Sequence, residues 1–400
     1  MSKTEIPTTN YTTFSEQIAS FLATAIENEK AVAIWRFPSQ SLISGCLGSP
    51  LDNYISPTIS ENGVSGFAFH PFEINHESSH PIFIQNEISL DNFAEALELP
   101  ELPIAFLQAG IKSISTNKKL EIENLPFSYL SPEIAPAPSR PFAEKVTSAI
   151  SAIENGNFQK VVLSDSKSMA VPRLDISALF LLTCTAYPDA FISVVAIPSV
   201  GIWVGASPEL LVNFSNDQIF QTYALAGTKP LDITTDLKNV PWTTKEIEEQ
   251  ALVARYIVNC FKKIRVREYE EHGPKTVQAG PLVHLRTDFS IDNKEVNYPD
   301  LPEVLLGLLH PTSAVCGMPK EPALDFILKN ERSSRKYFSG FLGPIHHTLG
   351  SSVYVNIRCI EITGKGANLY AGAGITATSN PENEAKEIDI KMQVMGKLLH

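Results

Sequence analysis

The succession of strand-like and helix-like segments is the feature that most constrains the fold of this chain. Short apolar runs separated by turns predict four strands of an antiparallel meander, at residues 190–197, 201–205, 209–214 and 218–223. The helical period of apolar residues predicts helices at 142–153, 174–186 and 244–265, and near 301–309 and 321–330. Because the strands come in runs and do not alternate regularly with helices, the pattern predicts an α+β fold.

The N-terminal part fits the same fold class. We predict a helix at 14–28, a strand at 31–37 and short strands at 66–69 and 82–84. The stretch 126–141, with five prolines and three serines, is predicted to be a connection. We therefore divide the chain into residues 1–135, the N-terminal part of the sheet scaffold, and residues 136–400, the catalytic region, within one structural domain.

The C-terminal pattern is clearer. Strands are predicted at 340–346 and 352–362, and the second pairs through the turn at Gly364–Gly366 with a strand at 367–376. A last helix is predicted to begin at residues 379–382, where a capping-box spacing coincides with an early-helix proline.

Composition and charge narrow the class of protein. An apolar content of 44% in 400 residues is enough for a sizeable core. The first fifteen residues lack the basic and apolar regions of a signal peptide, and the stretch 176–185 is too short to span a bilayer, so we expect a cytoplasmic protein. A net charge of −12 argues against nucleic acid and membrane as partners. Five scattered cysteines without a CxxC spacing favour buried thiols over disulfides or a zinc site.

Two pairs of acidic residues fall on the apolar faces of predicted helices. Glu246 and Glu249 continue the apolar stripe of the helix at 244–265, and Glu384 and Glu387 lie on or beside the buried face of the last helix. Carboxylates directed at the interior are costly unless they are paired or metal-bound, and oxygen ligands without a His or Cys set suit Mg²⁺. The residues alone leave a second interpretation equally open, in which both pairs complement the helix macrodipole near a first turn.

Four short motifs occur in order between residue 159 and the C-terminus. They are Gln159-Lys160-Val161-Val162-Leu163, Gly205-Ala206-Ser207-Pro208-Glu209, Ala226-Gly227-Thr228 and Ala371-Gly372-Ala373-Gly374-Ile375. Together they resemble the chorismate-binding enzymes, a family of isochorismate, salicylate, anthranilate and aminodeoxychorismate synthases. The resemblance covers roughly residues 140–400 and rests on shared order and spacing, since each motif alone is weak. It implies the fold of chorismate-utilising enzymes, with large antiparallel β-sheets packed together and helices on the outside.

The resemblance implies roles for residues that would otherwise be ordinary. Lys160 matches the general base that activates water, although a lone strand lysine usually faces solvent. Glu209 matches the general acid that protonates the departing C4 hydroxyl, although its position also suits an exposed turn residue. The four glutamates match metal-binding glutamates, and Mg²⁺ is the implied cofactor. The positions that match the substrate-binding set are Ala226, Gly227, Thr228, His310, Ala314, Arg358, Ala373, Gly374 and Lys391.

These substrate-binding assignments have simpler alternatives. The glycine-containing segments 226–228 and 371–374 would let backbone amides approach a carboxylate, and ordinary turn chemistry is the alternative. The planar fork of Arg358 suits a substrate carboxylate, unless it is a surface strand arginine. His310 opens a His-Pro-Thr loop and is assigned to substrate positioning rather than metal binding. The pair His346-His347 is assigned to a strand and not to a site.

Three positions discriminate between members of the family. Lys160 argues against the two ammonia-adding synthases, and Ala226 stands where aminodeoxychorismate synthases carry a nucleophilic lysine. Ala314 favours isochorismate synthases over salicylate synthases, which tend to carry Thr there, so salicylate synthase remains the alternative. A non-catalytic chorismate-binding relative is a third reading, which the occupied acid, base and metal positions disfavour.

Three departures from the family pattern are present. Asp165 stands where the family usually has Arg, Gln250 replaces a histidine on the first metal helix, and Phe338 replaces a tyrosine. None of them removes a catalytic role, but Asp165 changes the charge balance near Lys160.

The expected activity is therefore that of an isochorismate synthase, an isomerase. It converts chorismate to isochorismate by water addition at C2 and loss of the C4 hydroxyl, and depends on Mg²⁺ held by Glu249 and Glu384 with help from Glu246 and Glu387. The product would serve menaquinone or siderophore biosynthesis. The expected partner is the small-molecule substrate, with no glutamine amidotransferase subunit, and the protein would be a monomer or homodimer.

Overall fold

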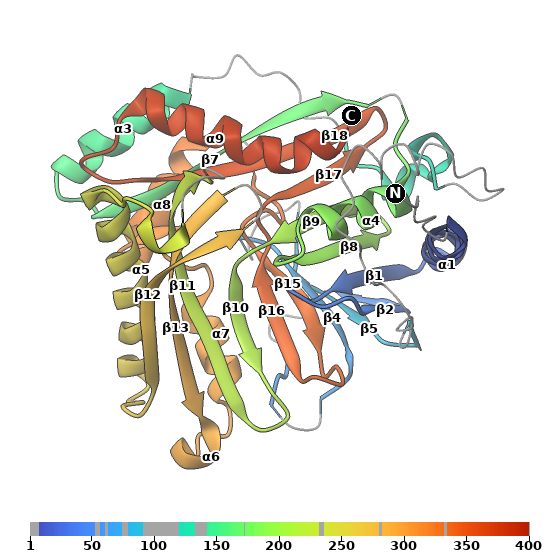
Figure 1. Ribbon diagram of the computed structural model, residues 1–400, viewed down its shortest axis with the longest axis horizontal. Coiled ribbons are helices and arrows are strands. Elements are labelled where there is room, and N and C mark those ends of the chain that lie inside the picture. Colours follow the sequence, from blue (N-terminus) through green and yellow to red (C-terminus); the bar gives the residue numbers. More distant parts are fainter. Residues whose placement is uncertain are drawn as a thin grey trace, which may run out of the picture.

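The chain forms two large β-sheets that face each other and carry helices on their outer sides (Figure 1). The computed structural model describes residues 8–52, 57–60, 63–73, 79–90, 120–132, 142–171, 173–231, 236–279, 282–331 and 334–399. A search of these residues finds no helix with both the length and the apolar character needed to cross a bilayer.

In the described part of the chain, the first sheet contains nine strands in the order β14-β7-β18-β17-β9-β8-β1-β2-β6. Their bounds are β1 Ala31–Arg36, β2 Ile43–Gly48, β6 Ile88–Ser89, β7 Lys160–Ala170, β8 Phe191–Ile197, β9 Gly201–Ser207, β14 Gly317–Met318, β17 Cys359–Thr363 and β18 Gly366–Ile375. The strand pairs are antiparallel. The ladder between β7 and β18 pairs Val162 with Gly374, which brings the motif of Lys160 beside the glycine-containing motif near the C-terminus.

The second sheet also has nine strands among the described residues, in the order β12-β13-β11-β10-β16-β15-β4-β5-β3. Their bounds are β3 Pro50–Asp52, β4 Gly66–His70, β5 Ile82–Gln85, β10 Leu210–Phe214, β11 Ile219–Pro230, β12 Glu270–Ala279, β13 Leu282–Asp292, β15 Phe341–Ile345 and β16 Ser351–Val355. Its pairs are antiparallel as well. Strands from the first ninety residues thus take part in both sheets.

Aromatic side chains fill the space between the sheets. Phe191 of the first sheet stacks on Tyr354 of the second, with ring centroids 4.1 Å apart. Trp35 of β1 packs against Phe67 of β4 at 5.2 Å. Such pairs contribute about 0.5–1.5 kcal/mol each beyond the area they bury, so this layer holds the two sheets in register.

The helices cover the outer faces of the sheets. Their bounds are α1 Thr8–Glu27, α3 Phe142–Glu154, α4 Ile176–Ala186, α5 Thr244–Lys263, α6 Asn293–Val296, α7 Leu301–Leu309, α8 Lys320–Asn330 and α9 Pro381–Gly396, with short 3₁₀ helices η1 Ile122–Asn124, η2 Phe127–Tyr129, η3 Leu237–Asn239 and η4 Lys397–Leu399. Helix α5 packs on β11 and β13, and α9 packs on β18 and α3. Asn380 caps α9, since its side chain accepts hydrogen bonds from the backbone amides of Glu382 and Asn383.

Most predicted elements are present, and the α+β class with antiparallel sheets and outer helices is confirmed. The predicted helices match α1, α3, α4, α5, α7, α8 and α9 within a few residues, apart from the start of α1 at Thr8. The hairpin of β12 and β13 was missed, because β12 is an edge strand of mostly exposed residues and carries no apolar period. The predicted connection at 126–141 contains η2, and its residues 133–141 lie outside the described part of the chain.

Two of the strand predictions were wrong, and both errors have the same cause. The predicted meander is divided between the sheets, because β8 and β9 belong to the first and β10 and β11 to the second. The predicted strand at 352–362 is likewise two strands, β16 and β17, in different sheets. In both cases the chain passes from one sheet to the other, at residues 208–209 and at 356–358, where Arg358 has a left-handed φ of 52°.

These two crossings lie side by side. Ser207 Oγ donates a hydrogen bond to the carbonyl of Val355 at 2.6 Å, and the amide of Ala206 donates to the carbonyl of Arg358 at 3.0 Å. The amide of Val355 donates to the carbonyl of Glu209 at 2.9 Å. A pair of antiparallel crossings between the central strands of the two sheets therefore carries Glu209 and Arg358 to the same region.

Candidate active site

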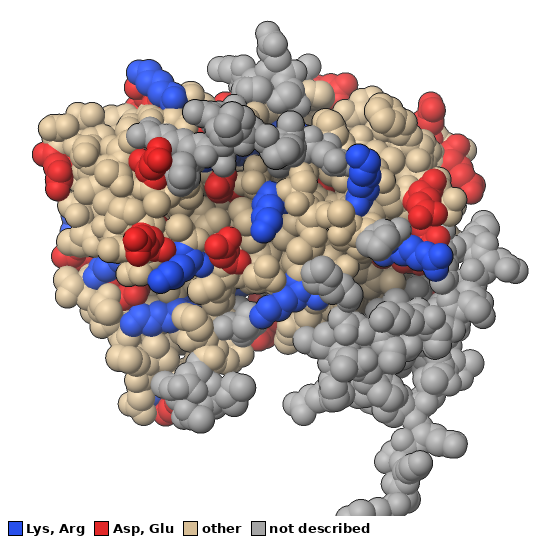
Figure 2. Space-filling model, turned by 90° about the horizontal axis from the view of Figure 1, so that it is seen from above, with Lys and Arg blue, Asp and Glu red and all other residues tan. Residues whose placement is uncertain are grey.

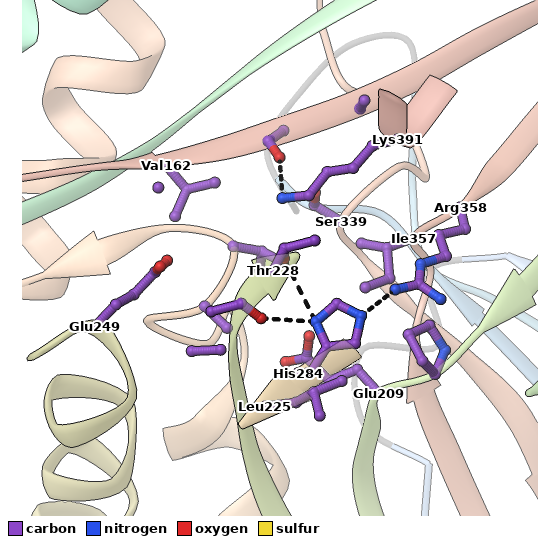
Figure 3. A pocket seen from close by; sticks show the side chains of 18 of the residues that line it. Val162, Glu209, Leu225, Thr228, Glu249, His284, Ser339, Ile357, Arg358 and Lys391 are labelled. Carbon is purple, nitrogen blue, oxygen red and sulfur yellow. Dashed lines mark hydrogen bonds between the residues drawn. The ribbon is translucent and has the colours of Figure 1, made fainter. Parts of the chain in front are cut away.

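A cavity opens beside the two crossings, and residues from all four motifs reach it (Figure 3). The walls come from β7, β11, β13, β18, α5, α9 and the loop before β14. Of the predicted site residues, those that line it are Glu209, Ala226, Gly227, Thr228, Glu249, Ala314, Arg358, Gly374 and Lys391.

Lys160 begins β7 and is completely buried. Its Nζ lies 3.1 Å from Glu249 Oε1 on α5. The charge of Lys160 also lowers the pKa of Glu209, so the amine and that carboxyl are close enough to interact. The alternative of a solvent-facing strand lysine is wrong, and the amine lies beside the cavity between two carboxyl groups.

Glu209 is 5% exposed and lies at the crossing between β9 and β10. Burial raises its pKa to about 7, in spite of the lowering effects of Lys160, of a hydrogen bond from Thr312, and of Arg358 and Lys391. Thr312 Oγ1 donates this bond to Glu209 Oε1 at 3.4 Å. A carboxyl group with a pKa near neutrality is protonated in a large fraction of molecules, which suits a general acid.

Arg358 is held by a histidine that the sequence reasoning missed. Arg358 Nη2 donates to His284 Nε2 at 2.5 Å, and His284 Nδ1 donates to the carbonyl of Gly227 at 2.8 Å (Figure 3). Burial and the charge of Arg358 lower the pKa of His284 well below its ordinary value, so the imidazole is neutral and this pattern fixes its proton on Nδ1. Burial lowers the pKa of Arg358 to about 10, which leaves the guanidinium charged at neutral pH.

A sequence signal for His284 existed. The residue interrupts the apolar run Leu282–Leu285, in the same way that Lys160 interrupts its own apolar strand. The signal was passed over because β13 itself was not predicted.

Glycines let α5 approach the two sheets closely. A Cβ at Gly374 would lie 2.3 Å from Glu249 Oε1 and 3.1 Å from Lys160 Cε. A Cβ at Gly227, whose φ is 69°, would lie 3.0 Å from the Cβ of Glu246. The missing side chains thus make room for the acidic face of α5, in addition to any role of the backbone amides in binding an anion.

The four predicted metal ligands each face a lysine. Glu249 pairs with Lys160 as described, Glu384 Oε1 lies 2.5 Å from Lys245 Nζ, Glu387 Oε1 lies 2.7 Å from Lys391 Nζ, and Glu246 Oε2 lies 3.8 Å from Lys229 Nζ. Glu246 also closes a capping box with Thr243 at the start of α5. In the described part of the chain, no three His, Cys, Asp or Glu side chains converge closely enough to form a metal site.

Lys245 connects the acidic residues of the two helices. Burial lowers the pKa of its ammonium, but the charges of Glu384, Glu387 and Glu249 outweigh burial and raise it. Glu384 is 1% exposed, and its Oε2 has no hydrogen-bond partner among the described residues. Burial raises the pKa of Glu384 even though Lys245 lowers it. The ammonium of Lys245 therefore interacts with three carboxylates, and Oε2 of Glu384 is buried without a hydrogen-bond partner among the described residues.

Two predicted substrate-binding residues do not line the cavity. His310 is buried, with Nε2 3.2 Å from the carbonyl of Pro71 and its ring edge-on to His70 and Phe341. Ala373 is completely buried on β18 and does not line the cavity, although Gly372 and Gly374 on either side of it do.

The departures from the family pattern have local explanations. Asp165 lies on the face of β7 opposite Lys160 and pairs with Lys145 of α3 at 3.3 Å, so its charge is balanced away from the cavity. Gln250 Nε2 donates to the carbonyl of Ala224 and to Thr287 Oγ1, which fixes α5 on the second sheet. Phe338 lines the cavity and stacks on Tyr370.

A buried arginine joins two walls of the cavity. Arg335, 2% exposed, donates to the carbonyl of Val162 on β7 and to the carbonyl of Val315 in the loop before β14, each at 2.7 Å. Its charge is balanced by Glu331 at 2.5 Å, whose carboxylate also accepts hydrogen bonds from the amide and hydroxyl of Ser164. Arg335 and Glu331 thus fix the spacing between the strand of Lys160 and the loop of Ala314.

Comparisons with known proteins agree with this arrangement. A family model described as chorismate binding enzyme matches residues 87–400. The chain is 27% identical over 315 residues to the vibriobactin-specific isochorismate synthase of Vibrio cholerae, a match that covers 74% of this chain and 76% of that protein. It is 30% identical over 277 residues to isochorismate synthase DhbC of Bacillus subtilis, covering 66% and 68% of the two chains.

Solved structures share the fold. MenF, the menaquinone-specific isochorismate synthase from Escherichia coli, superposes with a TM-score of 0.68 at 21% identity over 96% of this chain and 91% of its own. Anthranilate synthase component I from Streptococcus pneumoniae gives 0.59 at 22% identity over 84% and 81%. The chain belongs to the chorismate-binding enzymes. Within that family, the curated relatives named above are isochorismate synthases.

The buried pair of Arg335 and Glu331 leads to a stability prediction. Arg335→Met should destabilise the protein by about 3–5 kcal/mol, because it leaves the carboxylate of Glu331 buried without its counter-charge. Lys145→Met, the matched control, removes the partner of the more exposed Asp165 and should cost about 1 kcal/mol or less. Equilibrium unfolding in urea measures both, and equal losses would contradict the role of Arg335.

Proposed function

We propose that this protein is an isochorismate synthase, an isomerase that converts chorismate to isochorismate. The observation that carries the proposal is that a buried amine, Lys160, interacts with a buried carboxyl, Glu209, which lines the cavity and whose pKa is raised to about 7. Water addition with loss of a hydroxide needs a group that takes a proton and a second group that gives one. The product would enter menaquinone or siderophore assembly, because the relatives are named for these routes.

Lys160 and Glu209 each take part in one proton transfer in the proposed reaction. Lys160, acting as the general base, takes a proton from water as the water oxygen bonds to C2 of the ring. Both ring double bonds shift, from C1=C2 to C1=C6 and from C5=C6 to C4=C5, the C4–O bond breaks, and Glu209 gives its proton to the departing hydroxyl, which leaves as water. One water enters and one leaves, so the product is an isomer, and both side chains recover their starting protonation by exchange with solvent.

The substrate is a dicarboxylate, and the protein carries a net charge of −12. On the face shown in Figure 2, basic side chains are interspersed with acidic ones and form no single basic surface. The cations for the substrate are in the cavity instead, since Arg358 and Lys391 both line it. We assign Arg358 and the backbone of 226–228 to the enolpyruvyl carboxylate, because His284 connects them. Thr228 and Gly374 complete the binding surface.

Glu249 and Glu384 would hold a Mg²⁺ ion, with Glu387 and Glu246 beside them. When bound, the ion supplies positive charge to the ring carboxylate of the substrate. Lys245 pairs with Glu384 and also interacts with the charges of Glu387 and Glu249, so its ammonium would compete with the metal for these carboxylates.

Product analysis tests the proposal. Incubation with chorismate and Mg²⁺ should give isochorismate without pyruvate. Lys160→Met and Glu209→Gln should each abolish turnover in both directions while the protein stays folded, because each removes one of the two proton-transfer groups. Lys167→Met changes an exposed lysine of the same strand and should leave turnover unchanged. Stoichiometric salicylate and pyruvate would instead assign the salicylate synthase activity.

The raised pKa of Glu209 predicts a pH dependence. A general acid must be protonated, so kcat should fall as the pH rises through about 7. The hydrogen bond from Thr312 stabilises the ionised carboxylate and lowers its pKa, so Thr312→Val should raise that pKa and move the alkaline limb to higher pH. A limb that stays in place, or that moves to lower pH, would argue that another group supplies the proton.

The competition by Lys245 predicts an effect on metal affinity. A chelator should abolish activity and added Mg²⁺ should restore it. Lys245→Gln should tighten Mg²⁺ binding by roughly tenfold, because two cations about 4 Å apart repel by about 1–4 kcal/mol depending on the effective dielectric. Calorimetric titration with Mg²⁺ measures this without turnover. Weaker binding to the variant would show that Lys245 supports the metal rather than competing with it.

A further inference from the structure

The backbone around Glu209 is fixed by three hydrogen bonds. The amide of Glu209 donates to Ser207 Oγ at 3.2 Å, and its carbonyl accepts from the amide of Val355 at 2.9 Å. The carbonyl of Pro208, in the same peptide group as the Glu209 amide, accepts from the hydroxyl of Tyr223 at 2.6 Å. Because the backbone sets the direction in which a side chain leaves it, these bonds direct the carboxyl of Glu209.

Tyr223 reaches this peptide group from β11, outside the two crossings. Burial raises the pKa of Tyr223 to about 12, although Arg286 and a hydrogen bond from the amide of Leu210 lower it. The hydroxyl is therefore protonated at neutral pH and remains a donor. It bridges backbone groups of residues 208 and 210, on either side of Glu209. Tyr223 is not among the described residues that line the active-site cavity, so it has no direct contact with a substrate bound there.

The strand ladder does not hold this segment by itself. The pairing of β10 with β16 shifts its register between Leu210 and Val212, directly after Glu209. Such a bulge interrupts the regular ladder, and bulges beside active sites direct side chains. A hydrogen bond from a side chain outside the ladder therefore supplies a constraint that the irregular pairing lacks.

A row of charged side chains across the second sheet holds the ring of Tyr223. The guanidinium of Arg286 on β13 lies over the ring, 4.0 Å from its centroid. Arg286 Nε donates to Asp288 Oδ1 at 2.5 Å, and Lys275 Nζ of β12 lies 2.6 Å from Asp288 Oδ2. Since a cation over an aromatic face is attracted by the ring quadrupole, this row stabilises the position of the ring that carries the hydroxyl.

We propose that Tyr223 is a positioning residue for the general acid. Its hydroxyl holds the backbone of residues 208–210, so that the carboxyl of Glu209 stays within reach of the departing hydroxyl of the substrate, and Arg286 keeps the ring in place. This role rests on the proposed function, in which Glu209 gives the proton.

Tyr223→Phe removes the hydroxyl and keeps the ring. We expect kcat to fall about tenfold, since a displacement of a reacting group by about 1 Å can cost on the order of a hundredfold in rate. KM for chorismate should change less than twofold, because the acid acts on the departing group in the transition state. The alkaline limb near pH 7 should stay in place, because the effects that set the pKa of Glu209 come from burial and from groups other than Tyr223.

Tyr354→Phe is the matched control. Tyr354 is buried and its hydroxyl interacts with Tyr223 and Arg286, but in the described part of the chain no hydrogen bond joins it to residues 207–210. Its kcat should match that of the unaltered protein. Arg286→Met removes the cation over the ring and leaves Asp288 paired with Lys275. It should lower kcat about threefold at unchanged KM, and it tests the same role if Tyr223→Phe does not fold.

Infrared spectroscopy of the protonated Glu209 carboxyl gives a second measurement that needs no turnover. In Tyr223→Phe, the carbonyl band that Glu209→Gln removes should broaden at an unchanged titration midpoint, because the carboxyl then occupies more than one environment. If Glu209→Gln kept its activity, the proposed function would fail, whereas the width of the band would still report on Tyr223.

Four results would overturn the role of Tyr223. These are a kcat of Tyr223→Phe within twofold of the unaltered protein, an equal loss of kcat in Tyr354→Phe, a loss expressed in KM alone, and an infrared band of unchanged width. A shift of the alkaline limb in Tyr223→Phe would also overturn it, because Tyr223 would then act on the pKa of Glu209 and not on its position.

Discussion

The account depends on the burial of two groups at one cavity, the amine of Lys160 and the carboxyl of Glu209. In water, the carboxyl would be ionised at neutral pH and could not give the proton that the reaction requires. Burial raises the pKa of Glu209 to about 7, and the nearby cations keep it from rising further. For Glu249, the net shift of the pKa is downward. Burial raises its pKa, but Lys160, Lys245 and Lys391 outweigh burial and keep the carboxylate ionised. Two buried carboxyl groups near the same lysine thus have pKa values that are shifted in opposite directions. Glu209 can therefore serve as the acid while Glu249 stays ionised.

The two-sheet architecture places these groups. The paired crossings near residues 208 and 357, between central strands of the two sheets, bring Glu209 and Arg358 together, and the paired strands β7 and β18 supply Lys160 and Gly374. Helix α5 contributes Glu249 through the gap left by Gly374. Arg335 then fixes the strand and loop walls at a constant spacing. Strands and helices therefore supply much of the wall of the cavity, which helps to position a proton donor and acceptor.

The sequence was informative where a signal is local. Apolar period and capping residues predicted the helices, and the four motifs brought together nine of the residues that line the cavity. It was uninformative where the signal depends on a distant partner. The apolar run through residues 352–362 hides the change of sheet, because nothing in its composition marks the left-handed turn at Arg358. Other contacts depend on segments that only the fold brings together. These are the ion pairs of the acidic residues with lysines, the bond of Arg358 to His284, and the packing of His310.

Infrared titration of the Glu209 carboxyl tests the central claim most directly. The carbonyl band of its protonated form, identified by its loss in Glu209→Gln, should disappear with a midpoint near pH 7. A midpoint at the ordinary glutamate value of about 4.3 would contradict the account, because the group would then be ionised at neutral pH and could not supply the proton.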